Sequence, residues 1–380
     1  MRILLLADLH IGAIKDTSYY YTTVTNIIDN ELIFKKSDMV VILGDYFDRL
    51  FKVNEEYVSL AVNIMSYLVR ACMKSETKIR IVYGTESHEM NQYKIFNHFF
   101  SSSNVDMKLF TTCTEEIVDG KSVLYIPEEY IANKLEFYKD TIYSGKKYDY
   151  IFGHGVITDG MPAIIGRSRE SDSINIENKV PHFNAGELSA AGKLVVFGHY
   201  HIAWDNDNVH YLGSLFRSAF GEEVPKRYGI IEDDKISFVE NTAAYDYITY
   251  EFNEDDKVYQ SSDEIMNVIN DVKEKNKELF NGDKHGKIRM IFHLPENVDP
   301  SFRENLKTLI FNDKIITPML KENITETVTD TEDEVKTEYD FILDPNMKIA
   351  DKIYNYILKT YESSMSIKDI EHYINDPLSI

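Results

Sequence analysis

Five short groups of acidic residues, histidines and glycines carry the clearest chemical signal in this sequence. They are Asp8-Leu9-His10, Gly44-Asp45-Tyr46-Phe47-Asp48, Ser87-His88-Glu89, Gly153-His154 and Gly198-His199-Tyr200-His201. Each group follows an apolar run of the kind that forms a buried strand. Carboxylate and imidazole ligands together suit manganese, iron or zinc better than calcium. The groups therefore favour a site for divalent metal ions.

The spacing within the groups supports this interpretation. Residues i and i+2 of an extended segment share a face, so Asp8 and His10 can bind one ion, and so can His199 and His201. A single Asp-x-His, Gly-Asp-x-x-Asp or Gly-His pattern is common by chance. All of them in one order, each after an apolar strand, predict a two-metal site.

Apolar runs over 2–7, 39–43 and 79–83 alternate with helical spacing over 21–34 and 56–73. This alternation predicts βαβ units and a buried parallel sheet. In such a sheet, ligands bind in the crevice beyond the carboxyl ends of the strands. The chemical groups lie at or just beyond those ends.

Beyond about residue 105, the sequence pattern changes to short strands. Runs over 121–127, 149–154, 193–199 and 209–214 predict a second sheet packed on the first, and the polar stretch 158–184 predicts a long surface loop.

Beyond the last chemical group, the pattern predicts smaller structural units. Helical and strand spacing over 262–275, 287–294 and 302–311 indicates a small α+β unit, and 346–380 predicts two amphipathic helices. The intervening stretch 322–338 is acidic and rich in threonine. We expect three parts, which are 1–244, 245–345 and 346–380.

Composition excludes several classes of protein. The 380 residues include 41 Lys and Arg against 63 Asp and Glu, a formal net charge of -22, which argues against binding nucleic acid through overall basic charge. Cys72 and Cys113 lack the spacing of a disulfide framework or a zinc site. No apolar run approaches the ~18 residues of a membrane span, so we expect a cytoplasmic protein without a membrane partner.

The ordered motifs resemble the pattern DxH, GDxxD, GNH[DE], GH and GHxH of the calcineurin-like metallophosphoesterases, over about residues 1–240. GDYFDRL and HYLGSLFRSAFGEE (210–223) are similar to the SbcD-type nuclease subunit of DNA double-strand-break repair and its bacteriophage recombination counterparts. The resemblance implies an α/β fold, a two-sheet sandwich flanked by helices. It also implies that 245–345 is an α+β capping domain and that 346–380 is a helical docking segment.

The resemblance also implies roles for individual residues. His88 would be the catalytic imidazole at the scissile phosphate. Ser87 would stand where the family has an asparagine, and its hydroxyl would be a weaker ligand of the second ion. The first ion would be bound by Asp8, His10, Asp45 and His201, and the second by Asp45, His154 and His199.

The function implied is a DNA exo- and endonuclease that uses two manganese ions, with magnesium as the alternative, in a bacterial or phage-infected cell. The expected partners are DNA, an SMC-like ATPase of the SbcC type that docks on 346–380, and a second copy of the chain. A plain intramolecular helix pair is the alternative for 346–380. The expected DNA contacts are Arg167, Arg169 and Arg217, with Lys146, Lys147, Lys226 and Arg227 as further local cations.

Two other functions fit the same motifs. A phosphomonoesterase or phosphodiesterase acting on a small substrate would share every metal ligand. A non-catalytic scaffold would have lost activity with the missing asparagine. Cleavage of DNA against release of phosphate from a small ester distinguishes these alternatives.

Overall fold

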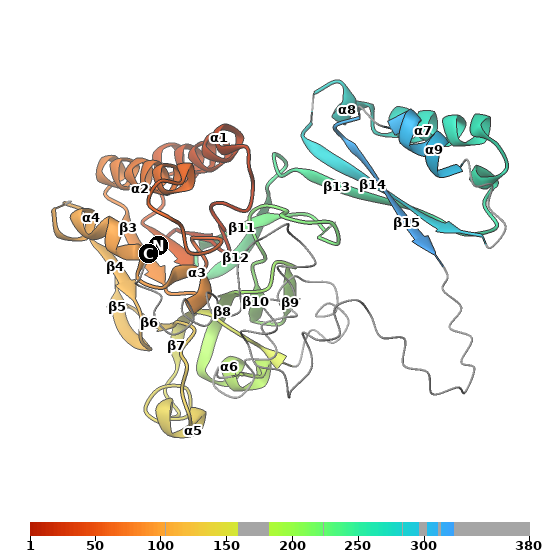
Figure 1. The fold of residues 1–380 in the computed structure, drawn as a ribbon. Coiled ribbons are helices and arrows are strands. Elements are labelled where there is room, and N and C mark those ends of the chain that lie inside the picture. Colours follow the sequence, from red (N-terminus) through yellow and green to blue (C-terminus); the bar gives the residue numbers. More distant parts are fainter. Residues whose placement is uncertain are drawn as a thin grey trace, which may run out of the picture. The chain divides into compact units, whose positions relative to one another are not determined.

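The computed structural model describes residues 1–102, 104–158, 182–222, 224–282, 284–295, 302–310 and 313–322. These residues form two six-stranded sheets and one three-stranded sheet, with helices packed against them (Figure 1). The expected helices within 346–380 lie outside the described residues, as does nearly all of the acidic segment and most of the predicted 158–184 loop.

The first sheet has the strand order β12-β11-β1-β2-β3-β4. The pairs β1–β2, β2–β3 and β3–β4 are parallel, which confirms the βαβ prediction, whereas β11 and β12 are antiparallel to their neighbours. The strands are β1 (Ile3–Leu6), β2 (Met39–Leu43), β3 (Lys78–Val82), β4 (Met107–Phe110), β11 (Arg227–Glu232) and β12 (Lys235–Glu240).

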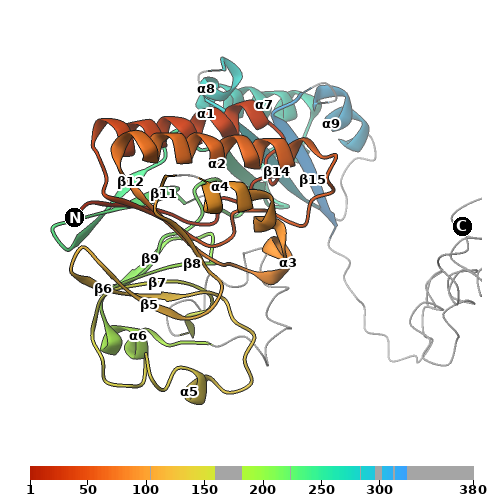
Figure 2. The ribbon, with the colours of Figure 1, turned by 90° about the vertical axis from the view of Figure 1, so that its left-hand side faces the viewer.

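Two long helices, α1 (Thr17–Ile28) and α2 (Glu56–Ser75), cover the outer face of this sheet (Figure 2). α2 buries Leu60, Ile64 and Leu68, which recur every four residues and form one apolar stripe. α1 begins earlier than the predicted 21, because the Asp16 side chain accepts a hydrogen bond from the Tyr19 backbone N–H and caps the helix. The chain continues from α1 as a π-helix, η1 (Asp29–Phe34).

The second sheet has the order β5-β6-β7-β8-β10-β9 and packs face to face with the first. Ile3 and Leu5 point into the shared core between the sheets, while Leu4 and Leu6 point toward the helices, as the two-residue period of a strand requires. The strands are β5 (Thr114–Val118), β6 (Lys121–Ile126), β7 (Tyr148–His154), β8 (Gly192–Gly198), β9 (Trp204–Asn206) and β10 (Val209–Tyr211).

The outer face of the second sheet packs on α6 (Ala185–Ala191), and the short helix α5 (Lys134–Phe137) lies in the loop after β6 (Figure 2). The described residues thus contain the predicted two-sheet sandwich with helices on both outer faces. Three short helices follow β3, and their bounds are α3 (Glu86–Glu89), η2 (Gln92–Phe96) and α4 (Asn97–Ser102).

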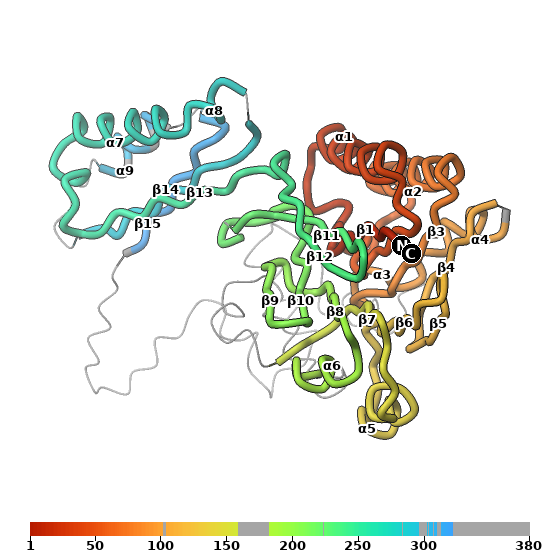
Figure 3. Tube along the Cα trace, turned by 180° about the vertical axis from the view of Figure 1, so that it is seen from behind, coloured from red at the N-terminus to blue at the C-terminus, as the bar shows by residue number. Residues whose placement is uncertain are grey.

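The described residues after 245 form an α+β unit with its own apolar core. Its three strands, β13 (Asp246–Phe252), β14 (Gly286–Leu294) and β15 (Ile316–Glu322), are all parallel. Figure 3 lets the reader follow the chain through the connecting helices. These are η6 (Lys257–Tyr259), α7 (Ser262–Lys275), α8 (Lys277–Phe280) and α9 (Phe302–Ile310). The exact domain boundaries stay predictions.

Among the described residues, no helix combines the length and the hydrophobicity needed to cross a membrane. Cys72 is buried and Cys113 is half-buried, and both are free thiols.

Candidate metal centre

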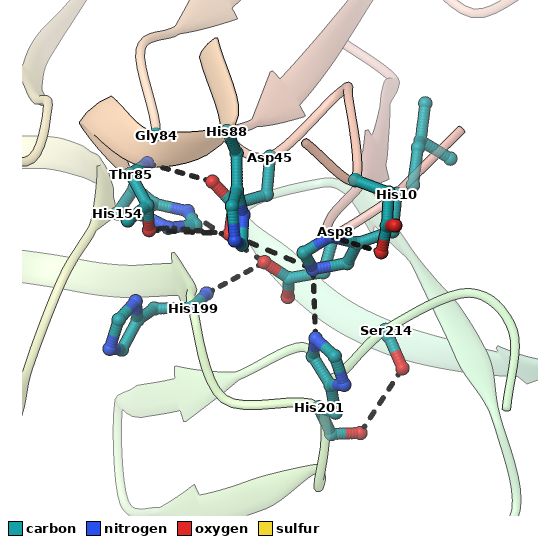
Figure 4. Close-up of polar contacts among 12 residues, drawn as sticks. Asp8, His10, Asp45, Gly84, Thr85, His88, His154, His199, His201 and Ser214 are labelled. Carbon is teal, nitrogen blue, oxygen red and sulfur yellow. Dashed lines mark hydrogen bonds and ion pairs between the residues drawn. The ribbon is translucent and has the colours of Figure 1, made fainter. Parts of the chain in front are cut away.

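The predicted metal ligands meet at one edge of the two facing sheets (Figure 4). Parallel strands end at a common edge, so residues far apart in the sequence converge there. Asp8 and His10 follow β1, Asp45 follows β2, His88 lies in α3 after β3, His154 ends β7, and His199 and His201 follow β8.

Asp45 is the centre of this cluster. Its Oδ2 lies 3.1 Å from His88 Nδ1, 3.4 Å from His154 Nε2 and 3.6 Å from His10 Nε2. Its Oδ1 accepts a 2.7 Å hydrogen bond from the Thr85 backbone N–H. The carboxylate is fully buried, so three imidazoles from three separate loops converge on a single buried anion.

Two overlapping sets of donor atoms fit divalent metal ions. One set comprises His10, Asp45 and His88, and the other comprises Asp45, His154 and His199. Within each set, the ligand atoms all lie within 4.8 Å of one another. Mixed carboxylate and imidazole donors suit borderline cations such as manganese and zinc. Asp45 belongs to both sets, as expected of a bridging ligand.

The two remaining predicted ligands lie in contact with this cluster. Asp8 Oδ1 accepts a 2.8 Å hydrogen bond from the His199 backbone N–H and lies 3.7 Å from His154 Nδ1. His201 Nε2 lies 2.8 Å from His10 Nε2. The structure therefore brings all six predicted ligands together with His88. The donor set that contains His10 and Asp45 includes His88, whereas Asp8 and His201 were the expected further ligands of that ion.

Four residues of the cluster have backbone conformations with positive φ. Asp8, His10 and Asp45 have φ angles of 47°, 44° and 48°, and His199 has φ of 106°. Residues other than glycine rarely adopt positive φ, and such conformations persist mainly where surrounding contacts enforce them, often at functional sites. These conformations are held in place by the contacts of the cluster, as is common at functional sites.

Two glycines are required by close packing around the cluster. A Cβ at Gly84 would lie 2.3 Å from both the backbone nitrogen and Oδ1 of Asp45. A Cβ at Gly198 would lie 2.2 Å from the Leu43 carbonyl oxygen. Both distances are far inside van der Waals contact, so a larger residue would displace the neighbouring ligand loops.

Thr85, rather than Ser87, is the hydroxyl residue in the cluster. Thr85 Oγ1 lies 3.3 Å from Asp45 Oδ2 and 3.4 Å from His154 Nε2, whereas Ser87 is exposed. Residues three apart on a helical turn share a face, so Thr85 and His88 point inward together and Ser87 does not. This corrects the expectation that Ser87 occupies the asparagine position. Thr85 follows Gly84 directly, as that asparagine would.

Glu128 is a component of the site that the motif search missed. Its Oε2 lies 3.3 Å from His199 Nδ1 and 3.8 Å from His154 Nε2, and the carboxylate is buried. The available signal was its place just after β6, the same position relative to a strand that the motif residues occupy.

Glu89 braces the two loops that carry Asp45 and His88. Its Oε1 accepts hydrogen bonds from the Tyr46 backbone N–H and the Tyr93 hydroxyl, and its Oε2 accepts one from the Gly84 backbone N–H. Complete burial and the nearby charge of Asp45 raise the pKa of Glu89 to about 7.

The buried charges of the cluster shift one another. Burial alone would raise the pKa of Asp45, but His154 and His88 hold it well below its usual value. Burial alone would lower the pKa of His154, but the carboxylates of Asp45, Asp8 and Glu128 raise it well above its usual value. The cluster thus stabilises positive charge beside Asp45, which is the electrostatic condition for binding cations.

The buried ion pair of Glu222 and Lys226 contacts His201 on the side away from the metal centre. Glu222 Oε1 lies 3.3 Å from His201 Nδ1, and Glu222 Oε2 lies 2.7 Å from Lys226 Nζ. Lys226 Nζ also donates to the His201 carbonyl oxygen and to Ser214 Oγ, each at 2.8 Å. Figure 4 shows Ser214 beside the His201 backbone.

Two residues expected to contact DNA have internal roles instead. Arg217 is buried, and its Nε donates to the carbonyl oxygens of Glu222 and Val224, while its Nη1 donates to that of Tyr245. Lys226 is buried against Glu222. These contacts correct the expectation that Arg217 and Lys226 bind phosphate.

Three of the other cations that were expected to contact DNA have partners within the protein, and two lie outside the described residues. Lys146 pairs with Glu115, Lys147 donates to the Ala190 carbonyl oxygen, and Arg227 pairs with Asp205. Arg167 and Arg169 lie outside the described residues. A DNA contact by any of these five stays a prediction.

The fold and the clustered donors define a metal-dependent phosphoesterase. The chain belongs to the calcineurin-like phosphoesterase family, whose sequence profile matches residues 1–203. The family hydrolyses phosphoester bonds, typically with two divalent metal ions.

No curated protein matches the chain. Several solved structures resemble the chain, and one of them, a crystal structure, aligns at 10% sequence identity, covering 63% of this chain and 99% of the other, with a TM-score of 0.38. A TM-score this low does not support a common fold.

Proposed function

We propose that this phosphoesterase is a DNA nuclease that cleaves phosphodiester bonds with two divalent ions, manganese or, as the alternative, magnesium. The observation that carries the proposal is the sharing of Asp45 between two sets of donors that face each other across the carboxylate. Two ions held by Asp45 and the buried imidazoles around it would lower the pKa of a water molecule and stabilise the attacking and leaving oxygens of an in-line displacement.

His88 is suited to contact the substrate. Its side chain is 23% exposed, whereas those of His10, His154, His199 and His201 are nearly or fully buried. An imidazole at the mouth of the site can donate a hydrogen bond to a non-bridging phosphate oxygen or protonate the departing sugar oxygen. Its 3.1 Å contact with Asp45 Oδ2 fixes the Nδ1 side of the ring and directs the other nitrogen away from Asp45.

Two features support a nucleic acid over a small ester as the substrate. The segments GDYFDRL and 210–223 are similar to those of SbcD-type nuclease subunits. The chain also adds the β13–β15 unit beyond the residues that the family profile matches. A phosphomonoesterase or phosphodiesterase for small substrates needs neither.

The net negative charge of the chain favours a partner protein that binds DNA. The net charge is -22, and among the described cations that were expected to bind DNA, Arg217 and Lys226 are buried in internal contacts. Phosphate neutralisation dominates non-specific DNA affinity, so the chain alone is poorly suited to bind DNA tightly. We propose an SMC-like ATPase of the SbcC type that docks on 346–380, and a second copy of the chain, as partners.

Cleavage assays test the function. Linear and hairpin duplexes should be cut with manganese or magnesium, more efficiently with the ATPase partner present, and the Asp45→Asn variant should be inactive. Release of phosphate from small monoesters without cleavage of DNA would instead establish the small-substrate alternative.

Co-purification tests the partner. Deleting 346–380 should abolish association with the ATPase while metal-dependent cleavage of single-stranded DNA persists. A truncated chain that co-purifies as well as the full chain would refute the docking assignment.

A further inference from the structure

A cavity of ≈ 880 Å³ lies beside the metal centre. Its walls come from β4, from residues just beyond the ends of β3, β4 and β6, and from α3, η2, α4 and α5. It therefore continues the crevice at the carboxyl ends of the strands, where ligands of α/β sheets bind. Its size falls within the range of about 300–1,000 Å³ that is usual for small-molecule sites.

Glu128 forms the wall between this cavity and the metal centre. Its Oε2 lies 3.3 Å from His199 Nδ1, and its Oε1 accepts a 3.3 Å hydrogen bond from the Tyr130 hydroxyl. Both Glu128 and Tyr130 line the cavity. A single carboxylate thus separates an aromatic ring of the cavity from a predicted metal ligand.

The cavity walls are rich in aromatic rings that are open to solvent. Tyr130 and Phe137 are 39% and 46% exposed, and Tyr83 and Phe100 are half-buried. Nucleobases stack on such rings, and each stacked base contributes on the order of 1–3 kcal/mol.

The metal centre is a better place for a phosphate than this cavity. Glu86, Glu128 and Glu129 line the cavity together with Lys94 and Lys108, and Lys108 is paired with Glu116. The carboxylates outnumber the lysines there, whereas the metal centre attracts an anion. Exposed Asn91 and Asn97 also line it, and their amides can donate to and accept from the edge of a base.

We propose that this cavity binds the unpaired nucleobase of a nucleotide whose phosphate lies at the metal centre. The assignment rests on the proposed nuclease function and names the part of the substrate that this neighbouring site recognises. It makes the enzyme selective for phosphodiesters that carry a base, and it favours frayed or single-stranded DNA, in which a base can leave the stack.

Two synthetic diesters test the proposal. Thymidine 5′-(p-nitrophenyl phosphate) and methyl p-nitrophenyl phosphate share a leaving group and differ in the nucleoside. The ratio of their kcat/KM values in the full-length protein with manganese measures recognition of the nucleoside. Tyr130→Ala and Phe137→Ala should each lower this ratio about tenfold, mainly through KM of the nucleoside substrate, as expected for loss of stacking.

Matched variants separate stacking from general damage. Tyr130→Phe keeps the ring and loses the hydroxyl, so it should retain most of the ratio. Phe34→Ala removes a ring that is 77% exposed on η1 and does not line the cavity, so it should leave the ratio unchanged. A ratio that is the same in wild type, Tyr130→Ala and Phe137→Ala would overturn the proposal.

Binding without turnover gives a second readout. Saturation-transfer NMR with thymidine 5′-monophosphate and the magnesium-loaded or metal-free protein should show transfer to the thymine protons, and Tyr130→Ala should reduce it severalfold. Equal thymine signals in the wild type and in Tyr130→Ala would refute the base site, even if the protein cleaves DNA. Conversely, thymine contacts that depend on Tyr130, in a protein that does not cut DNA, would keep the base site and refute the nuclease function.

Discussion

Glu222 lies directly behind His201, with its Oε1 3.3 Å from Nδ1 of the imidazole. The opposite nitrogen, Nε2, faces His10 and the metal centre. A carboxylate in this position fixes the tautomer and orientation of a histidine ligand and raises its basicity. Burial by itself would raise the pKa of Glu222, but His201 and Lys226 hold it well below its usual value, so the carboxylate is charged.

Glu222→Gln should therefore weaken metal binding about 10- to 100-fold, because the amide no longer stabilises the oriented imidazole as an anion does. Manganese titration calorimetry measures the affinity. Glu232→Gln, on an exposed strand end, is the matched control. Because the substitution leaves Lys226 buried without its anion, the double variant Glu222→Gln/Lys226→Met separates the metal effect from a folding defect. Unchanged affinity in both variants would remove Glu222 from the metal site.

His88→Ala should lower kcat by about 10²- to 10⁴-fold, because it removes the partly exposed imidazole that we propose acts at the phosphate. Manganese affinity should fall less in this variant than in His10→Ala, since His10 is buried and is a predicted ligand. Single-turnover cleavage and calorimetry measure the two effects. Equal losses of affinity in the two variants would make His88 a metal ligand and not an acid.

Thr85→Val should raise the manganese concentration needed for half-maximal activity severalfold, since it removes the hydroxyl beside Asp45 and His154 at nearly constant volume. Ser87→Ala should leave that concentration unchanged, because Ser87 is exposed. The reverse pattern would show that Ser87 enters the metal shell after all.

Arg80→Met should destabilise the first sheet by about 3 kcal/mol. The guanidinium is buried and binds the largely buried Glu116 and the half-exposed Asp106 at 2.8 Å each. The substitution leaves the Glu116 carboxylate with the exposed Lys108 in place of a buried bidentate partner. Urea unfolding followed by circular dichroism measures the change. Arg49→Met breaks an exposed pair with Glu55 and should cost much less stability than Arg80→Met. Similar losses in the two variants would contradict the role of burial.

Asp149 provides a pH-dependent test. The Lys193 ammonium and the Ser122 backbone N–H lower the pKa of Asp149 from 3.8 to about 2. A lowered pKa in the folded state contributes stability that is full above the unfolded pKa and is lost as pH falls through the folded value. The difference in melting temperature between wild type and Asp149→Asn should thus be constant above pH 5 and shrink between about pH 4 and pH 2. A difference that does not vary with pH would show that the carboxylate charge is not involved.

Much of the fold and of the site could be predicted from the sequence. Local periodicity identifies strands and helices because a strand buries every second residue and a helix every third or fourth. The strand over 39–43 and the helix over 262–275 have the predicted bounds. The ligands were predictable because each motif is a short segment at a strand end, and parallel strands must end at a common edge.

Only the tertiary structure decided which side chains share that edge and which serve inside the protein. Thr85 and Ser87 look interchangeable in the sequence, and the direction of one helical turn separates them. Glu128 follows β6 as the motif residues follow their strands, but its contact with His199 is set by the packing of the loops at that edge of the sheet. The sequence predicts Lys226 to be a surface cation, yet the side chain is buried against Glu222 and the His201 backbone. Contacts between distant segments depend on how the sheets pack, and that packing is set by the whole core rather than by any single stretch of chain.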